Sequence, residues 1–142
     1  MIYPEINYVA VLIASLANFV AGFAWFSPKT MFPVWWRAMG KSPDDQPGTE
    51  SMGTVFGLTI VGVFVQTFTI AVVIGWYGAT NLGEINLVSG AMIGSFIGIG
   101  SAAAASLSHR LFGGHGLKVW LIEVGSDILN ATLVGAVLGL LS

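Results

Sequence analysis

Hydrophobic residues dominate four stretches of the chain, and each stretch is long enough to cross a bilayer as one helix. A spanning helix needs about 20 mostly apolar residues. The stretches cover about residues 6–26, 53–77, 85–108 and 118–141. This pattern predicts an all-α membrane protein with a single domain, 1–142, in which four transmembrane helices form two hairpins.

Polar residues and prolines collect in one long connection, about residues 27–52, which holds four of the five prolines. Within it, the stretch MFPVWWRAM predicts a short helix at the membrane surface, because Trp35, Trp36 and Arg37 suit the level of the lipid headgroups. The other two connections, YGATNLGE and HRLFGGHGLK, are short.

A weak internal echo links the two predicted hairpins. SPKTMFPVW follows the first span and SHRLFGGHGLKVW follows the third, and both contain Ser, a basic residue, Phe and Val-Trp in that order. Two hairpins of the same orientation would form a parallel repeat. Chance or shared interfacial chemistry explains so short a match about as well as duplication does.

Composition supports lipid as the main surrounding of the chain. It is 55% hydrophobic and 8% charged, with a mean hydropathy of +0.83, whereas soluble domains carry about 25% charged residues. A net charge of −2 without a basic run argues against a nucleic-acid partner. The absence of cysteine excludes disulfides and thiolate metal sites.

The basic residues predict the orientation in the membrane. Three lie in the long connection, and Arg110 and Lys118 flank the last connection, whereas the YGATNLGE connection and both ends of the chain have none. The positive-inside rule therefore makes the long connection cytoplasmic and places both termini outside a multi-pass protein of the plasma membrane. Glu5 stands where a signal peptide would be positive, so the first helix is expected to be retained.

Small residues mark the faces along which the helices are expected to pack. Gly90, Gly94 and Gly98 recur in the third span, and helical spacing continues this stripe through Ser101, Ala105 and Ser108. One face of the last span carries Gly125, Thr132, Gly135 and Gly139. Helices in lipid approach closely through such residues. A glycine-lined conduction path is the alternative interpretation of the third span.

Two amides are expected to join helices inside the membrane. Asn18 lies in the first span beside Ser15 and Gly22, and Gln66 lies in the second on a stripe with Thr59. An amide in hydrocarbon requires a hydrogen-bond partner, so both side chains are predicted to bond to neighbouring helices.

The last span carries a polar face opposite its small residues. At 100° per residue, Glu123, Asp127 and Asn130 fall in one narrow sector beside Ser126. With a rise of about 1.5 Å per residue, Asp127 lies roughly 13 Å beyond Lys118, near the middle of a core about 30 Å thick. A charged acid there costs about 3 kcal/mol.

Several arrangements would relieve that cost, and the sequence leaves them open. The two acids can share a proton, or an acid can pair with His109, Arg110 or Lys118. An acid can also bond to Gln66 or Asn18, or it can face a water-filled cavity. These arrangements correspond to a structural role, a proton or cation site, or an anchor for a partner subunit.

No arrangement typical of an enzyme is present, so neither catalysis nor a cofactor is predicted. The chain has no phosphate loop, metalloprotease helix or nucleophile–base pattern. His109 and His115 lie near the acids, but their spacing fits no standard ligand pattern, so no metal site is predicted.

Two sequence blocks resemble a known membrane family. In the first block the resemblance rests on Trp25, Ser27, Pro28, Trp36, Met39 and Gly40, and in the second on Leu111, Phe112, Lys118, Trp120, Leu121, Ile122, Gly125, Gly135 and Leu138. The chain resembles a bacterial and fungal family described only as domain of unknown function 1761. The resemblance implies four spans and no assigned activity. This sequence departs from the family pattern at two positions. The family suggests an amide at the position of Glu123 and an aromatic residue or histidine at the position of Asp127.

The leading functional hypothesis is a small transport or channel-like protein that uses the two acids for protons or cations. The alternative is a structural or accessory subunit of a larger membrane complex. A homo-oligomer or a membrane partner is expected in either case, since both faces of the last helix require contacts. A hydrated path to Asp127 would favour transport, and a dry, fully paired acid would favour the structural role.

Overall fold

In the computed structural model, which describes residues 3–142, the chain folds into helices and contains no strand over that range. The helical fold class predicted from the sequence is therefore confirmed. The elements are α1 (Tyr8–Trp25), α2 (Phe32–Ala38), α3 (Met52–Ala79), α4 (Leu87–Ile97), the π-helix η1 (Gly98–Ala103), α5 (Ala104–Phe112) and α6 (Gly116–Leu140).

Four of the helical segments are long and apolar enough to cross a membrane. They are α1, α3, the continuous helix Leu87–Phe112 formed by α4, η1 and α5, and α6, with mean hydropathies between 1.5 and 2.2. These four segments confirm the predicted transmembrane helices. The short helix expected in MFPVWWRAM is present as α2, which has a proline in its first turn, where the missing N–H costs nothing.

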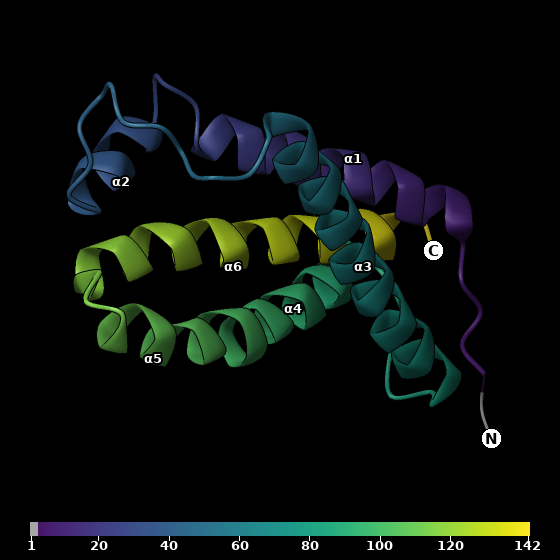
Figure 1. The fold of residues 1–142 in the computed structure, drawn as a ribbon. Helices are drawn as coiled ribbons and strands as arrows, with labels where there is room; N and C mark the ends of the chain where they lie inside the picture. Colours follow the sequence, from purple (N-terminus) through teal and green to yellow (C-terminus); the bar gives the residue numbers. More distant parts are fainter. Residues whose placement is uncertain (1–2) are drawn as a thin grey trace.

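The helices are arranged around α6, which lies between α1 and α4 (Figure 1). The third helix, α3, crosses the others steeply and packs against α1 and α6 and, less extensively, α4. Both termini lie at one end of the molecule, and α2 lies with the α5–α6 turn at the other. The hairpin of α4 and α6 is closely packed, whereas α1 and α3 cross at a steep angle. The two hairpins therefore differ in packing, and the parallel repeat suggested by the sequence stays a prediction.

The core lies in the half of the molecule nearer the termini. It contains small and branched residues from three helices: Ala10, Val11, Ala14, Ile70, Ala71, Ile74, Ala131, Val134 and Leu138. Many large apolar side chains of α1 and α3 are instead exposed, among them Leu12, Leu16 and Leu58. Such exposure is expected for helices whose surroundings are lipid rather than water.

Side-chain caps fix the starts of three long helices. The Asn7 side chain accepts a hydrogen bond from the Ala10 amide at the start of α1, and Ser51 caps α3 in the same way. Asn86 and Ser89 form a reciprocal capping box at the start of α4. These bonds satisfy backbone donors that the first turn leaves free.

The π-helix η1 corrects the prediction that one regular stripe of small residues runs along the third span. A π turn widens the helix and changes the register of the faces. As a result Ala103 is buried, whereas Ser101, Ala105 and Ser108 are exposed. The Trp120 indole of α6 donates to the Ala103 carbonyl at 3.1 Å, next to this wider turn. The mostly small residues of η1 (GIGSAA) permit the wider turn, which no periodic pattern in the sequence predicted.

Candidate functional site

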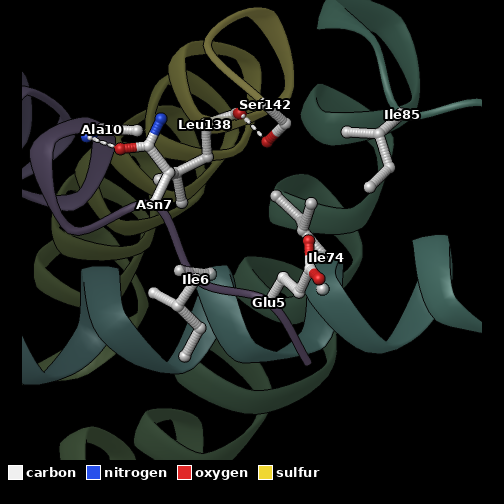
Figure 2. A pocket seen from close by; sticks show the side chains of 10 residues that line it. Glu5, Ile6, Asn7, Ala10, Ile74, Ile85, Leu138 and Ser142 are labelled. Atoms are coloured by element: carbon white, nitrogen blue, oxygen red, sulfur yellow. Dashed lines mark hydrogen bonds between the residues drawn. The ribbon is translucent and has the colours of Figure 1, made fainter. Parts of the chain in front are cut away.

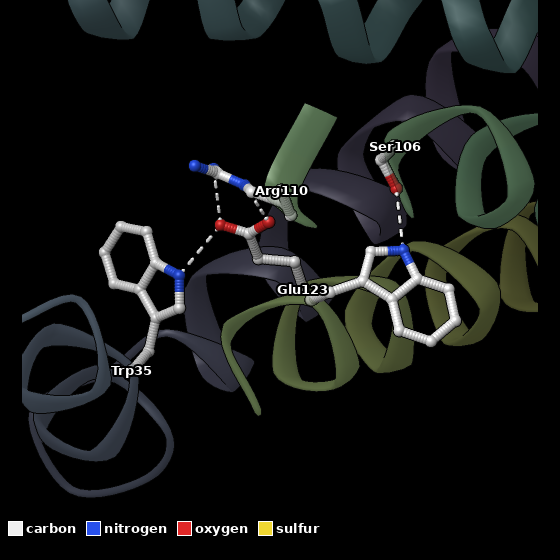
Figure 3. A network of polar contacts seen from close by, with 5 residues as sticks. Trp35, Ser106, Arg110 and Glu123 are labelled. Carbon is white, nitrogen blue, oxygen red and sulfur yellow. Dashed lines mark hydrogen bonds and ion pairs between the residues drawn. The ribbon is translucent and has the colours of Figure 1, made fainter. Parts of the chain in front are cut away.

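The two acids of α6 occupy different environments, and Glu123 is held in a polar network near the α5–α6 turn. Arg110 of α5 binds its carboxylate through two hydrogen bonds, from Nε at 2.7 Å and from Nη2 at 2.6 Å. The Trp35 indole of α2 donates to the same carboxylate at 2.9 Å. Figure 3 shows the carboxylate between the guanidinium and the indole. The Glu123 side chain is only 16% exposed, so the network ties three helices together away from bulk water.

This network settles one of the alternatives left by the sequence. Among residues 3–142 the only salt bridge joins Arg110 and Glu123, and His109 and Lys118 bind neither acid. Charge-assisted, two-pronged contacts of this kind are stronger than neutral hydrogen bonds. In another of the arrangements left open by the sequence, Glu123 and Asp127 share a proton. Both Glu123 oxygens instead bind other groups, and no hydrogen bond joins the two acids in the described range.

Asp127 lies one turn further along α6 and lines an open cleft of about 290 Å³ between α1, α3 and α6. No residue between 3 and 142 forms a hydrogen bond or an ion pair with its carboxyl group. We call this hollow the Asp127 cleft. It is lined by Asn18, Phe19, Gly22, Phe23, Phe26, Phe56, Thr59, Val63, Ser126, Asp127 and Asn130.

The amides around the Asp127 cleft bond to one another rather than to the acid. Asn18 donates from Nδ2 to Gln66 Oε1 at 3.0 Å, as expected of two intramembrane amides, and is 2% exposed. Asn130 donates to the Ser126 hydroxyl at 3.4 Å. The Asn130 Oδ1 atom is buried and has no partner in the described chain. The arrangement in which Asp127 bonds to Gln66 or Asn18, one of those left open by the sequence, is therefore not formed.

Polar oxygen atoms and apolar aromatic rings together line the Asp127 cleft. Carboxylate, amide and hydroxyl oxygens from Asp127, Asn130, Ser126 and Thr59 line it together with four phenylalanines. Hard cations and protons prefer oxygen ligands. Aromatic walls lower the local dielectric and strengthen the attraction between a carboxylate and a cation. The cleft can therefore bind a small cation or retain a proton.

The glycines of α4 and α6 form a close helix contact. A Cβ atom on Gly90 or Gly135 would overlap the backbone carbonyl of the other residue, and one on Gly94 would overlap the Ala131 carbonyl. Gly98 and Gly139 also contact the facing backbone, that of α6 and of the α4 N-cap respectively. The close-packing interpretation fits this geometry, and backbone atoms fill the space that a glycine-lined path would need.

Gly125 departs from the predicted face. A Cβ atom there would lie 3.0 Å from the Trp25 ring of α1, so this glycine accommodates an indole rather than α4. The same indole donates to the Ile122 carbonyl at 3.1 Å. The reason is the size of Trp25, which reaches across from α1 and occupies the side of α6 that helical periodicity assigned to the Gly135 face.

A second cavity, of about 360 Å³, opens at the end of the molecule that holds the termini (Figure 2). Its lining comes from the segment before α1, from α3, from the α3–α4 connection and from the end of α6, and includes Glu5, Asn7, Ile74 and Ser142. Asn7 fixes this end by donating to the Leu141 carbonyl at 3.1 Å. No sequence pattern predicted this cavity, because its walls come from segments that lie far apart in the chain.

Sequence reasoning also missed part of the Glu123 network. Trp35 was predicted only as an interfacial residue, yet its indole binds the acid. Trp120 likewise bonds to Ala103 and to the Ser106 hydroxyl at 3.2 Å. The one available signal was the clustering of tryptophans beside the spans, which marks depth in the membrane but names no partner.

Comparison with protein families identifies the family of this chain. A family model described as "Protein of unknown function (DUF1761)" matches residues 9–139. The chain belongs to this family. The match includes the four long helices of this DUF1761 protein except for the first residue of α1 and the last of α6, together with the Asp127 cleft and the Glu123 network. With its four apolar helices, the chain is a small multi-pass membrane protein. No curated protein and no solved structure matches the chain.

Proposed function

We propose that this DUF1761 protein moves protons or a small cation across the membrane, with Asp127 as the binding group. The observation that carries the proposal is the open cleft in which this carboxyl, unpaired within residues 3–142, lies beside the oxygens of Asn130 and Ser126. The role is that of a transporter or channel rather than an enzyme, and it requires no cofactor.

The cost of an intramembrane acid supports this role. A charged carboxyl in hydrocarbon costs about 3 kcal/mol on insertion scales. Glu123 offsets that cost through Arg110 and Trp35, whereas Asp127 has no such partner in the described chain. A proton, a cation or water in the cleft would offset the cost at Asp127, and the first two are the species that a transporter binds.

The positions of the two cavities also support transport. The Asp127 cleft lies toward the α2 end, which the basic residues predict to be cytoplasmic, and the second cavity opens toward the termini, predicted to be outside in the plasma membrane. The core cluster around Ile70 and Val134 separates them. Two cavities at opposite ends with a closed middle are what a gated path requires in one of its states.

The test is ion flux in proteoliposomes. Purified protein is reconstituted, and uptake is followed with a pH-sensitive dye and with radioactive sodium under imposed proton and sodium gradients. We expect flux from the unchanged protein. We expect Asp127→Asn to reduce that flux to the level of protein-free liposomes, because the amide keeps the shape but cannot bind a proton or carry charge.

Glu84→Gln is the matched control, since its side chain lies in the exposed α3–α4 connection and lines neither cavity. It should leave the flux unchanged. Absence of flux in the unchanged protein under both gradients would refute the proposal, and so would full flux in Asp127→Asn. Helix content and thermal unfolding of both variants establish that the fold is intact.

A second candidate function is that of a structural or accessory subunit, which assembles with copies of itself or with another membrane protein. It is favoured by the first part of α3, where every residue from Met52 to Gly62 is exposed, including Phe56 and Leu58. The mass of the complex in detergent, measured by native mass spectrometry, tests this role. A monomer at all concentrations, purified without a partner, would contradict it.

A further inference from the structure

We propose that the pocket at the end of α2 binds the phosphate group of an anionic phospholipid. The pocket has a volume of about 230 Å³ and is lined by Phe32, Pro33, Trp36, Arg37, Lys41 and Pro43. Two cationic side chains therefore meet two aromatic rings and two prolines in one hollow. The proposal does not depend on whether the Asp127 cleft carries ions.

Both cationic groups of the pocket are free to bind an anion. Neither Arg37 nor Lys41 takes part in a salt bridge within residues 3–142, where the only such pair is Arg110–Glu123. The Lys41 ammonium lies 4.4 Å from the centre of the Trp36 ring, and this contact positions it without neutralising it. Of the nearby acids, Asp45 accepts a hydrogen bond from the Ser42 amide at 2.7 Å, and neither Asp44 nor Asp45 lines the pocket.

The pocket is built before any ligand arrives, because the end of α2 folds back on itself. Trp36 is 7% exposed and donates from its indole to the Ser42 carbonyl at 2.7 Å. Gly40 has a φ of +78°, a conformation that glycine adopts without strain, and it turns the chain so that the Lys41 amide bonds to the Trp36 carbonyl at 3.2 Å. The Lys41 ammonium is thereby held over a fixed indole, and Arg37 lines the same pocket.

The place of α2 in the molecule favours a lipid over a free anion. Figure 1 shows α2 near the end of α1 and the start of α6, at the end opposite the termini, and tryptophans at the ends of spanning helices mark the level of the headgroups. Trp35 fixes α2 there through Glu123. The basic residues predict this side to be cytoplasmic, and that leaflet is the one rich in anionic lipid. The aromatic and proline walls fit a phosphate that carries an apolar chain.

Lipid binding by the purified full chain tests the assignment. Native mass spectrometry in detergent measures retention of phosphatidylglycerol and of phosphatidylcholine over a concentration series. We expect a clear preference for phosphatidylglycerol in the unchanged protein. The double variant Arg37→Gln/Lys41→Gln should bind it on the order of 25-fold more weakly, since each basic residue at an anionic surface contributes about a factor of five.

Lys29→Gln is the matched control, because Lys29 is a basic residue of the same connection that does not line the pocket. It should keep the preference. Equal retention of the two lipids by the unchanged protein, or an undiminished preference in the double variant, would overturn the proposal. Displacement of phosphatidylglycerol by inorganic phosphate at equal concentration would overturn the lipid assignment and leave a simple anion site. Single variants, each expected to lose about fivefold, replace the double variant if it does not fold.

Discussion

Gly90 of α4 and Gly135 of α6 face each other so closely that a Cβ atom on either would overlap the carbonyl group of the other. The backbones of the two helices are therefore in direct contact at this point. One turn further along α4, a Cβ atom on Gly94 would likewise overlap the Ala131 carbonyl of α6. Apolar helices gain little by leaving lipid for each other, so close packing of this kind is a main source of their association.

Replacing Gly94 with Ala should therefore destabilise the protein, and the same change at Gly100 should not. The two glycines lie in one continuous helix, but a Cβ on Gly100 has nothing within 4 Å. Overpacking of a close contact costs about 1–3 kcal/mol, and the gain in helix propensity is common to both variants. Thermal unfolding in detergent measures the difference. Equal stability would mean that α4 and α6 do not pack as described.

Arg110 and Glu123 should contribute to the free energy of unfolding as a coupled pair, so that losing one partner costs more than losing both charges together. Arg110→Gln leaves a mostly buried carboxylate with the Trp35 indole as its one remaining partner among residues 3–142. We expect the free energy of unfolding to fall by about 1–3 kcal/mol, because an unpaired charge stays buried. The double variant with Glu123→Gln should recover part of that loss, since no uncompensated charge remains.

The control for this pair is Arg37→Gln, which removes an exposed basic residue that forms no salt bridge in residues 3–142. Its stability should stay within the error of the measurement. Equilibrium unfolding in mixed micelles provides the free energies for a double-mutant cycle. Strictly additive losses from Arg110→Gln and Glu123→Gln would contradict the coupling.

The fold was largely predictable because bilayer thickness imposes a length on every span. Hydropathy alone located α1, α3, the α4–η1–α5 helix and α6, and two tryptophans with an arginine located α2. The π-helix η1 was not predictable, since its residues also suit an ordinary helix; the wider turn lies where the Trp120 indole of α6 bonds to the Ala103 carbonyl. The steep crossing of α3 likewise depends on tertiary packing, which has no periodic signature.

The candidate site was predictable by residue type but not by pairing. Helical spacing placed Glu123, Asp127 and Asn130 on one face, and the amides of Asn18 and Gln66 were expected to seek partners. The sequence could not say that these two amides would bind each other and leave Asp127 to the cleft. Such choices depend on helix rotation and depth, which are set by distant contacts such as Gly90 with Gly135.

The hydrogen bond between Asn18 and Gln66 predicts a measurable coupling between α1 and α3. Changing either residue to Leu leaves the other amide without its partner inside the membrane. We expect each single variant to lose stability and the double-mutant cycle to yield a coupling of about 1 kcal/mol. Thr69→Val is the control, because Thr69 is exposed and bonds within its own helix to Val65. A coupling near zero would argue against the contact.

The orientation predicted from the basic residues can be tested with topology reporters. A reporter fused after Ser142 should lie outside the cell, and one inserted near Asp45 should lie in the cytoplasm. Alkaline phosphatase and green fluorescent protein fusions report opposite compartments and act as controls for each other. A cytoplasmic carboxyl terminus would reverse the assignment of the two cavities.

Water access to the Asp127 cleft separates transport from a structural role, and the chain is suited to measure it because it contains no cysteine. Thr59 lines the cleft, whereas its neighbour Leu58 does not and is 68% exposed on the apolar outer surface of α3. Thr59→Cys should react with a charged, membrane-impermeant thiol reagent, since the reactive thiolate forms where water reaches. Leu58→Cys, at nearly the same depth, should stay unlabelled. In oriented vesicles the reaction should proceed from the side of residues 27–52, toward which the cleft lies. Equal protection of both cysteines from either side would mean a dry cleft and would contradict ion binding at Asp127.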